Sequence, residues 1–197
     1  MIWFISDTHF GHANIIRFCN RPFASVEEMD ETLVRNWNDR VAPTDTVFIL
    51  GDLFFRCGNV ESILPRLKGS KRLILGNHDA SWIGRVSLTA HFKSADNYFE
   101  GSIGSVGATL CHYPMLSWPH SARTYMIHGH IHNNTHEDFW PLLVARDRVL
   151  NAGVEINGYR PVTLEELIEN NRRFKAEHGV GAPRSHRGSA EVQRVRV

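Results

Sequence analysis

The sequence predicts an α/β fold on the basis of two patterns in its N-terminal part. Short apolar runs at 1–5, 46–50 and 72–75 have the nearly continuous hydrophobicity of strands that are covered on both faces. Segments with helical periodicity separate these runs along the chain. Because alternating strands and helices usually build a parallel sheet with helices on its faces, we expect an α/β architecture with ligands at the carboxyl ends of the strands.

Side chains that can bind metal follow each of the three runs. Asp7 and His9 come after the first run and are two residues apart, so an extended backbone would turn both to the same side. Asp52 follows the second run, and Asn77 and His78 follow the third. A capping carboxylate or a surface histidine would explain any one of them alone. Since parallel strands end at the same edge of a sheet, we expect these side chains to converge.

Helices are expected in several segments. The longest, 25–41, has capping-box spacing at Ser25 and Glu28, and its single apolar stripe indicates a helix that faces the core. A second long helix is expected over 163–174, with the same capping-box spacing at its start. A short helix or turn is expected over 14–19, and a short helix over 60–67. None of these stripes indicates a cofactor site.

The second half of the chain is richer in strand-like segments. Glycines separate several of them, which is typical of an antiparallel arrangement. Two segments place further histidines at strand ends: His112 follows one, and His130 and His132 follow another with the spacing of Asp7 and His9. The expected strands lie at 88–93, 95–100, 104–112, 125–127 and 147–157.

The length of 197 residues fits one domain, which we place at 1–178, followed by a basic tail at 179–197. The tail lacks apolar periodicity, so we expect it to be flexible.

The chain has three widely spaced cysteines, an odd number, which favours reduced thiols and a cytoplasmic protein over a disulfide framework. No apolar run is long enough to span a bilayer, so no membrane partner is expected. The oligomeric state stays open, a dimer included.

The ligand-type residues fall into short motifs whose order is the basis of a family resemblance. The motifs are Asp7-x-His9, Gly51-Asp52, Gly76-Asn77-His78-Asp79, His112 and Gly129-His130-x-His132. In this order, over residues 1 to about 160, the sequence resembles the calcineurin-like metallophosphoesterase family. The resemblance implies a four-layer αββα sandwich with a dinuclear metal site at the carboxyl ends of the strands.

The resemblance also implies a role for each ligand. Asp7, His9 and His132 would bind the first ion; Asn77, His112 and His130 would bind the second; Asp52 would bridge the two. Independently of the resemblance, a ligand set of imidazole, carboxylate and amide oxygen without a thiolate suits two divalent ions such as Mn, Fe, Co, Ni or Zn. Manganese is our first expectation.

The same residues suggest a reaction. Two divalent ions, two aspartates and a hydroxide carry a formal charge of about +1, which suits a phosphate ester. The resemblance implies attack on phosphorus by a metal-bound hydroxide, with His78 assisting the leaving group and Asp79 orienting His78. Nearby arginines are expected to contact the substrate: Arg56 first, then Arg17 and Arg21.

The leading hypothesis is a phosphodiesterase that acts on small or nucleotide-like esters. A phosphomonoesterase or nucleotide hydrolase is the alternative enzyme. A nuclease is less favoured, because the net charge is only +1 and no basic or aromatic platform is evident. A metal-binding scaffold without catalysis is a further alternative, but it would not need His78 beside a complete ligand set.

Overall fold

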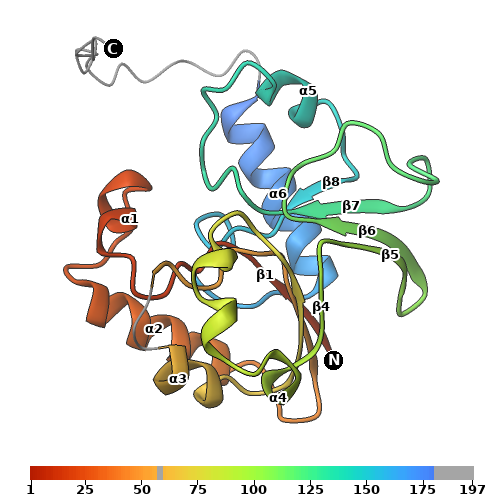
Figure 1. The fold of residues 1–197 in the computed structure, drawn as a ribbon. Coiled ribbons are helices and arrows are strands. Elements are labelled where there is room, and N and C mark those ends of the chain that lie inside the picture. The colour runs from red at the N-terminus through yellow and green to blue at the C-terminus, as the bar shows by residue number, and fades with distance from the viewer. Residues whose placement is uncertain (57–59, 180–197) are drawn as a thin grey trace, which may run out of the picture.

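The computed structural model describes residues 1–56 and 60–179, and its strands form two four-stranded sheets (Figure 1). The first sheet is parallel, in the order β1-β2-β3-β4. Its strands are β1 (Ile2–Ile5), β2 (Thr46–Ile49), β3 (Ser70–Ile74) and β4 (Phe92–Asp96). The second sheet has the order β5-β6-β7-β8, with β5 antiparallel to β6 and the other pairs parallel. Its strands are β5 (Tyr98–Ile103), β6 (Val106–Cys111), β7 (Tyr125–His128) and β8 (Val149–Asn151).

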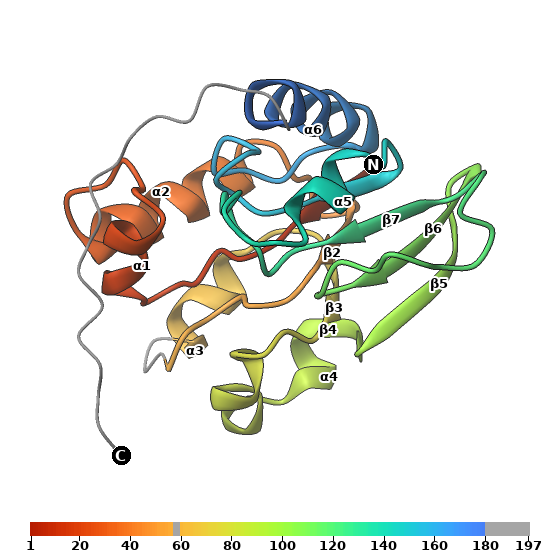
Figure 2. The ribbon, with the colours of Figure 1, turned by 90° about the horizontal axis from the view of Figure 1, so that it is seen from above.

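Helices pack against both sheets, and the last of them contacts a strand of each sheet, β1 and β8. The helices are α1 (Ala13–Phe18), α2 (Val26–Asn38), α3 (Val60–Ile63), α4 (Leu88–His91), α5 (Trp140–Val144) and α6 (Leu164–His178), with 3-10 turns at Leu64–Arg66, Asp79–Ser81 and Ile83–Arg85. Figure 2 shows α1 and α2 on one side of β1, with β5, β6 and β7 on the other. No helix within the described ranges is long and apolar enough to cross a membrane.

The core consists of three apolar layers, as expected for strands that are buried on both faces. Trp3 and Ile5 of β1 pack with Trp37 of α2 in the layer between the first sheet and its helices. Phe4, on the opposite face of β1, packs with Leu110 of β6 between the two sheets. A third layer lies between the second sheet and α5. Full burial of such a side chain stabilises the fold by about 1.5–3 kcal/mol. The predicted αββα sandwich is confirmed.

Backbone hydrogen bonds join the two sheets at one end of β1. The backbone N–H of Ser6 donates to the carbonyl of Ala152 at 2.9 Å, and Val154 N–H donates to the carbonyl of Ser6 at 3.2 Å. Within β1, the backbone N–H of Phe4 donates to the carbonyl of Val162 at 2.8 Å, and the N–H of Val162 donates to the carbonyl of Phe4 at 3.0 Å. The loop after β1 is therefore fixed against the loop after β8, which places the strand ends of both sheets next to each other.

Several elements differ from the sequence prediction. The segment Leu88–His91 is a helix and not the predicted strand. Periodicity alone does not distinguish a helix from a strand in so short a run. The helix expected over 60–67 is one α-helical turn followed by a 3-10 turn, since Pro65 lacks the N–H that an α-helix needs. The strand expected over 147–157 ends at Asn151, and the residues beyond it form turns.

Other differences concern the second sheet and the chain end. That sheet is mostly parallel, whereas glycine-separated runs suggested antiparallel strands. Helix α5 was not indicated by the sequence pattern. Both long helices begin as predicted, with Ser25 and Thr163 as their N-caps. The proposed tail lies, apart from Gly179, outside the described residues.

Candidate metal centre

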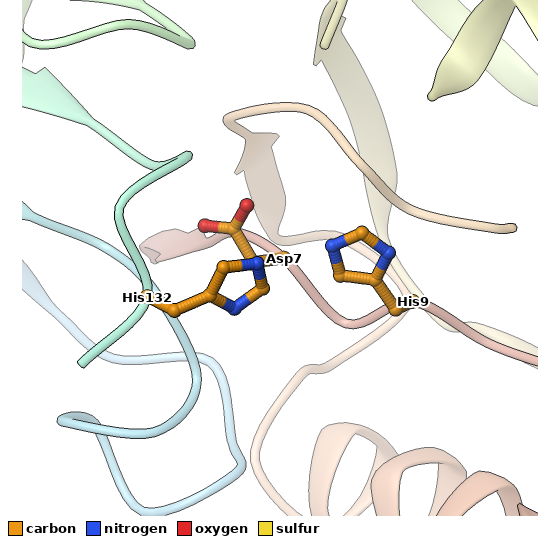
Figure 3. A group of neighbouring side chains, drawn as sticks. All are labelled: Asp7, His9 and His132. Carbon is orange, nitrogen blue, oxygen red and sulfur yellow. The ribbon is translucent and has the colours of Figure 1, made fainter. Parts of the chain in front are cut away.

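The ligand-type side chains come together where strands of both sheets end. Asp7 follows β1 and Asp52 follows β2, while His112 and His132 follow β6 and β7 of the second sheet. Ligand atoms of Asp7, His9 and His132 lie within 4.8 Å of one another, as do those of Asp7, Asp52 and His112. Figure 3 shows the first group with its three side chains side by side. Because the two groups share Asp7, they form one continuous cluster.

Left-handed backbone at the ligand residues produces this convergence. Asp7 (φ 56°), His9 (51°), Asp52 (51°), His130 (72°) and His132 (50°) all have positive φ. The two-residue spacings had suggested extended backbone, and the structure corrects this. Left-handed backbone costs a residue with a side chain about 1–2 kcal/mol, and such strained positions concentrate at functional sites.

Two motif glycines allow the loops to approach this closely. A Cβ atom on Gly76 would meet the Asp52 carboxylate and would lie 2.7 Å from the Asp52 backbone nitrogen. A Cβ atom on Gly129 would meet the Ser6 side chain and would lie 2.6 Å from Oδ2 of Asp7. Any larger residue would push apart loops that belong to different strands, so glycine is required at both positions.

His9 is a buried imidazole whose surroundings fit a metal ligand. Among the described residues, neither ring nitrogen of His9 has a hydrogen-bond partner. Its ring packs against those of His132 and His78, with centroids 5.0 and 5.3 Å away. Burial and the neighbouring His132 lower the pKa of His9 well below its usual value, so the ring is neutral. A buried polar atom without a partner is unfavourable by about 1–3 kcal/mol, whereas a metal ion would bind such a nitrogen directly.

Asp52 lies between histidines of both parts of the cluster. Its Oδ2 atom is 3.4 Å from Nε2 of His112 and 3.6 Å from Nε2 of His9. Its Oδ1 atom accepts a hydrogen bond of 2.9 Å from the backbone N–H of His78. Burial acts to raise the pKa of Asp52, but hydrogen bonding and charge from His112 outweigh burial and hold this pKa at about 2. Asp52 is therefore a charged carboxylate that faces both parts.

Asn77, His112 and His130 form the second part of the cluster. Oδ1 of Asn77 lies 3.1 Å from Nε2 of His112 and 3.0 Å from Nδ1 of His130. Nδ1 of His112 donates to the carbonyl of Leu50 at 2.7 Å, because a carbonyl oxygen only accepts. This bond fixes the ring with Nε2 toward Asn77, which is the usual arrangement of a histidine that binds metal.

Glu155 is a buried carboxylate of the cluster that the sequence pattern does not reveal. Its side chain is 2% exposed, and its Oε1 atom accepts a hydrogen bond from Nδ1 of His132 at 2.9 Å. Burial acts to raise the pKa of Glu155, but the Arg21 charge and His132 hold this pKa at about 2. The available signal was one carboxylate between Val154 and Ile156, inside a segment predicted to be a strand.

His78 lies at the mouth of the cluster with its side chain 40% exposed. Its Nε2 atom is 3.9 Å from Oδ2 of Asp52, and its ring packs against Phe55 with centroids 5.0 Å apart. The ring is therefore close to the ligand residues and still accessible to a molecule that enters from solvent.

The hydrogen bonds of Asp79 differ from those expected for a residue that orients the His78 ring. Its carboxylate accepts hydrogen bonds from the backbone N–H groups of Asp52, Leu53 and Gly76 and from the indole of Trp82, all at 2.8–3.0 Å. These bonds connect the loop after β2 to the loop after β3. Asp79 thus fixes the loop in which His78 lies, and its hydrogen bonds go to groups other than the His78 ring.

The arginines expected at the substrate have unequal access to the site. The Arg21 side chain is 0% exposed and hydrogen-bonds to protein groups, so the structure does not bring it to the site surface. Arg17 and Arg56 are exposed. The guanidinium of Arg17 lies 5.4 Å from the ring centroid of Phe18, and that of Arg56 lies 5.4 Å from the ring centroid of Phe55. The Phe55 ring next to Arg56 also packs against His78.

A cleft of about 630 Å³ opens beside His130 and His132. Aromatic rings and amide side chains contribute much of its wall, and none of its described lining residues is a lysine or arginine. The lining residues are Phe18, Cys19, Asn20, His130, Ile131, His132, Asn133, Asn134, His136, Glu137 and Phe139. The cleft can receive an uncharged organic group from a molecule bound at the cluster.

The fold and the cluster together define an αββα sandwich with a candidate metal centre where strands of both sheets end. The family model for calcineurin-like phosphoesterases matches residues 1–188, and the chain belongs to this family. The chain is accordingly a metal-dependent phosphoric ester hydrolase of a family that uses dinuclear metal centres.

Similar proteins match the chain over most of its length. The uncharacterized protein MJ1445 of Methanocaldococcus jannaschii is 36% identical over 171 residues, which cover 85% of this chain and 89% of that protein. The Gene 66 protein of Mycobacterium phage L5 is 27% identical over 212 residues, which cover 90% and 97%. The crystal structure of AQ665 from Aquifex aeolicus, a protein of unknown function, superposes with a TM-score of 0.68 at 27% identity and covers 86% of this chain and 98% of that one.

Proposed function

We propose that the chain is a phosphodiesterase that hydrolyses small or nucleotide-like phosphate esters with two divalent ions, manganese first among them. The main support for a metal-dependent reaction is His9, a neutral and buried imidazole whose nitrogens have no partner within the described structure. It lies in a cluster with two carboxylates and further histidines. Such a set of nitrogen and oxygen ligands suits divalent transition metals.

We assign the ligands as two overlapping sets. Asp7, His9 and His132 would hold the first ion, Asn77, His112 and His130 the second, and Asp52 would contact both. The distances of 3.4 and 3.6 Å from Asp52 to His112 and His9 support a shared carboxylate. When bound, the two ions supply Lewis-acid charge to the phosphoryl group and lower the pKa of water.

The protein residues around this centre position the ester and move one proton. His78 lies at the mouth, where its Nε2 can donate a proton to the oxygen that leaves phosphorus. Phe55 packs against the His78 ring and restricts its rotation. Arg56, exposed over the same Phe55, is the first candidate for contact with a phosphate oxygen.

A diester is favoured over a monoester by charge. A diester carries one negative charge, and a monoester is close to a dianion at neutral pH. Two divalent ions exceed the charge of Asp7 and Asp52 by about two, and a hydroxide reduces the sum to about +1. The charges of the buried Arg21 and Glu155 cancel each other, and the described walls of the cleft contain no lysine or arginine for a second phosphate charge. The cleft instead suits the uncharged second group of a diester.

A substrate comparison tests this proposal. We expect kcat/KM for methyl nitrophenyl phosphate, a diester, to exceed that for nitrophenyl phosphate by about tenfold or more. Two unit charges 4 Å apart interact by about 1 kcal/mol in water and by more in a buried site. The second charge of a monoester would lack this interaction. Bis-nitrophenyl phosphate, measured with the same ion and pH, separates the diester charge from the contribution of a second ring. A clear advantage for nitrophenyl phosphate would instead identify a phosphomonoesterase.

Metal binding is expected to release protons from two ligands. Burial acts to lower both pKa values, but Asp52 raises the pKa of His112 to about 9, and Asp7 raises that of His132 to about 11. Both values lie above neutral pH, so these rings are charged in the metal-free protein and must become neutral to bind a cation. Apparent affinity should therefore rise with pH through the neutral range. Calorimetric titration with Mn²⁺ in buffers of different ionisation enthalpy measures the released protons, and buffer-independent heats would contradict the expectation.

A further inference from the structure

A buried ion pair connects the loops that contain the ligands of the first ion. Nε and an Nη atom of Arg21 donate to Oε1 of Glu155 at 3.1 and 2.7 Å. The same Oε1 atom accepts the 2.9 Å hydrogen bond from Nδ1 of His132. The side chains of Arg21 and Glu155 are only 0% and 2% exposed. The pair therefore lies inside the protein, directly behind the His132 ring.

Arg21 also hydrogen-bonds to the loop after β1. One Nη atom donates to the backbone carbonyl of Asp7 at 2.7 Å, and the other donates to the carbonyl of Thr8 at 2.8 Å. These carbonyls lie between Asp7 and His9, both of which have left-handed backbone. Arg21 thus stabilises the strained turn that directs the Asp7 and His9 side chains into the cluster.

Glu155 determines which nitrogen of His132 is available. A carboxylate only accepts hydrogen bonds, so Nδ1 of His132 must carry the proton of that contact, and Nε2 is the nitrogen left for a ligand. Figure 3 shows one ring nitrogen of His132 on the side of Asp7 and the other turned away from it. This orientation matches the group of ligand atoms formed by Asp7, His9 and His132.

We propose that Arg21 and Glu155 are positioning residues that assemble the first metal site. The inference rests on the proposed ligand sets. Asp7 and His9 come from the first sheet and His132 from the second, and the ion pair bonds to both loops. Within the described structure, no hydrogen bond of the pair reaches Asn77, His112 or His130. Loss of the pair should therefore weaken the first site and spare the second.

The experiment is a titration with Mn²⁺ alone, read by calorimetry on wild type and on Glu155→Gln. The glutamine retains the shape of the side chain and removes its charge. We expect one site to weaken by about 10–100-fold, the range for residues that orient a metal ligand, and the other site to stay within about threefold of wild type. Glu31→Gln, which removes the exposed partner of Arg66, is the matched control and should change neither site.

A double-mutant cycle identifies the affected site. Adding Glu155→Gln to His132→Ala should cause little further loss, because the residue through which Glu155 acts is already gone. Adding it to His112→Ala should weaken the remaining site by the same 10–100-fold as in wild type. Full additivity with His132→Ala, or wild-type affinity at both sites of Glu155→Gln, would overturn the proposal.

Two further measurements separate this proposal from other failures. If Glu155→Gln folds poorly, Arg21→Met combined with Glu155→Met removes both charges and leaves no unpaired buried ion. That variant should show the same selective weakening, and two wild-type sites in it would refute the positioning role. Saturating Mn²⁺ should restore kcat in Glu155→Gln, and a persistent loss would also refute it. A wild-type protein that binds fewer than two ions would reject the ligand sets themselves.

Discussion

Replacing Asp52 with asparagine is expected to weaken both metal sites and to lower kcat/KM by about 10³-fold or more. Oδ2 of Asp52 faces Nε2 of His112 at 3.4 Å and Nε2 of His9 at 3.6 Å, so it is placed to serve both ions. The substitution exchanges a charged ligand atom for a neutral one. Several kcal/mol of charge stabilisation come from the ions in such centres, and each 1.36 kcal/mol is about tenfold in rate.

His132→Ala is the comparison that makes the Asp52 result specific. His132 belongs to one of the two ligand sets, so its loss should weaken mainly one site in a Mn²⁺ titration, whereas Asp52→Asn should weaken both. The fold should tolerate the asparagine, because its amide oxygen can still accept the 2.9 Å hydrogen bond from the His78 backbone. Melting temperatures measured in a chelator check this point. Retention of both ions with wild-type affinity and rate would disprove the shared-ligand assignment.

The position of the site could be predicted because its signals are local. An apolar strand followed by a carboxylate, an amide or a histidine occurs at the end of β1, β2, β3, β6 and β7. Sheet geometry then brings such ends together, whatever the details of each loop. The same patterns predicted an α/β architecture, since strands without a polar face must be covered on both sides, whereas the four αββα layers were implied by the family resemblance.

The parts that could not be predicted depend on contacts between distant residues. Arg21 and Glu155 are separated by 134 positions, and no local pattern indicates that they form a pair. Glu155 lies in the segment 147–157, which was predicted to be one strand, but the chain turns after Asn151, and the carboxylate is buried against His132. The left-handed backbone at Asp7 and His9 was hidden for the same reason, because tertiary hydrogen bonds from Arg21 stabilise that loop.

His78→Ala is expected to lower kcat by about 10²–10⁴ while both ions stay bound. Nε2 of His78 lies 3.9 Å from Oδ2 of Asp52, and the side chain is 40% exposed. The ring can therefore reach a leaving oxygen, and it is not part of the buried core. Its backbone N–H, which donates to Asp52, is unchanged in the variant. The loss should depend on the leaving group, since a weakly basic oxygen departs without protonation and an alkoxide does not.

A series of methyl aryl phosphates with leaving groups of increasing pKa measures this dependence. In His78→Ala, the logarithm of kcat should fall more steeply along the series than in wild type, because only wild type can protonate the departing oxygen. His78→Gln is the matched control: its amide can donate a hydrogen bond but cannot transfer a proton at neutral pH. It should therefore show the steep dependence of the alanine variant. Equal losses for good and poor leaving groups would exclude proton donation by His78 and leave it a role in binding only.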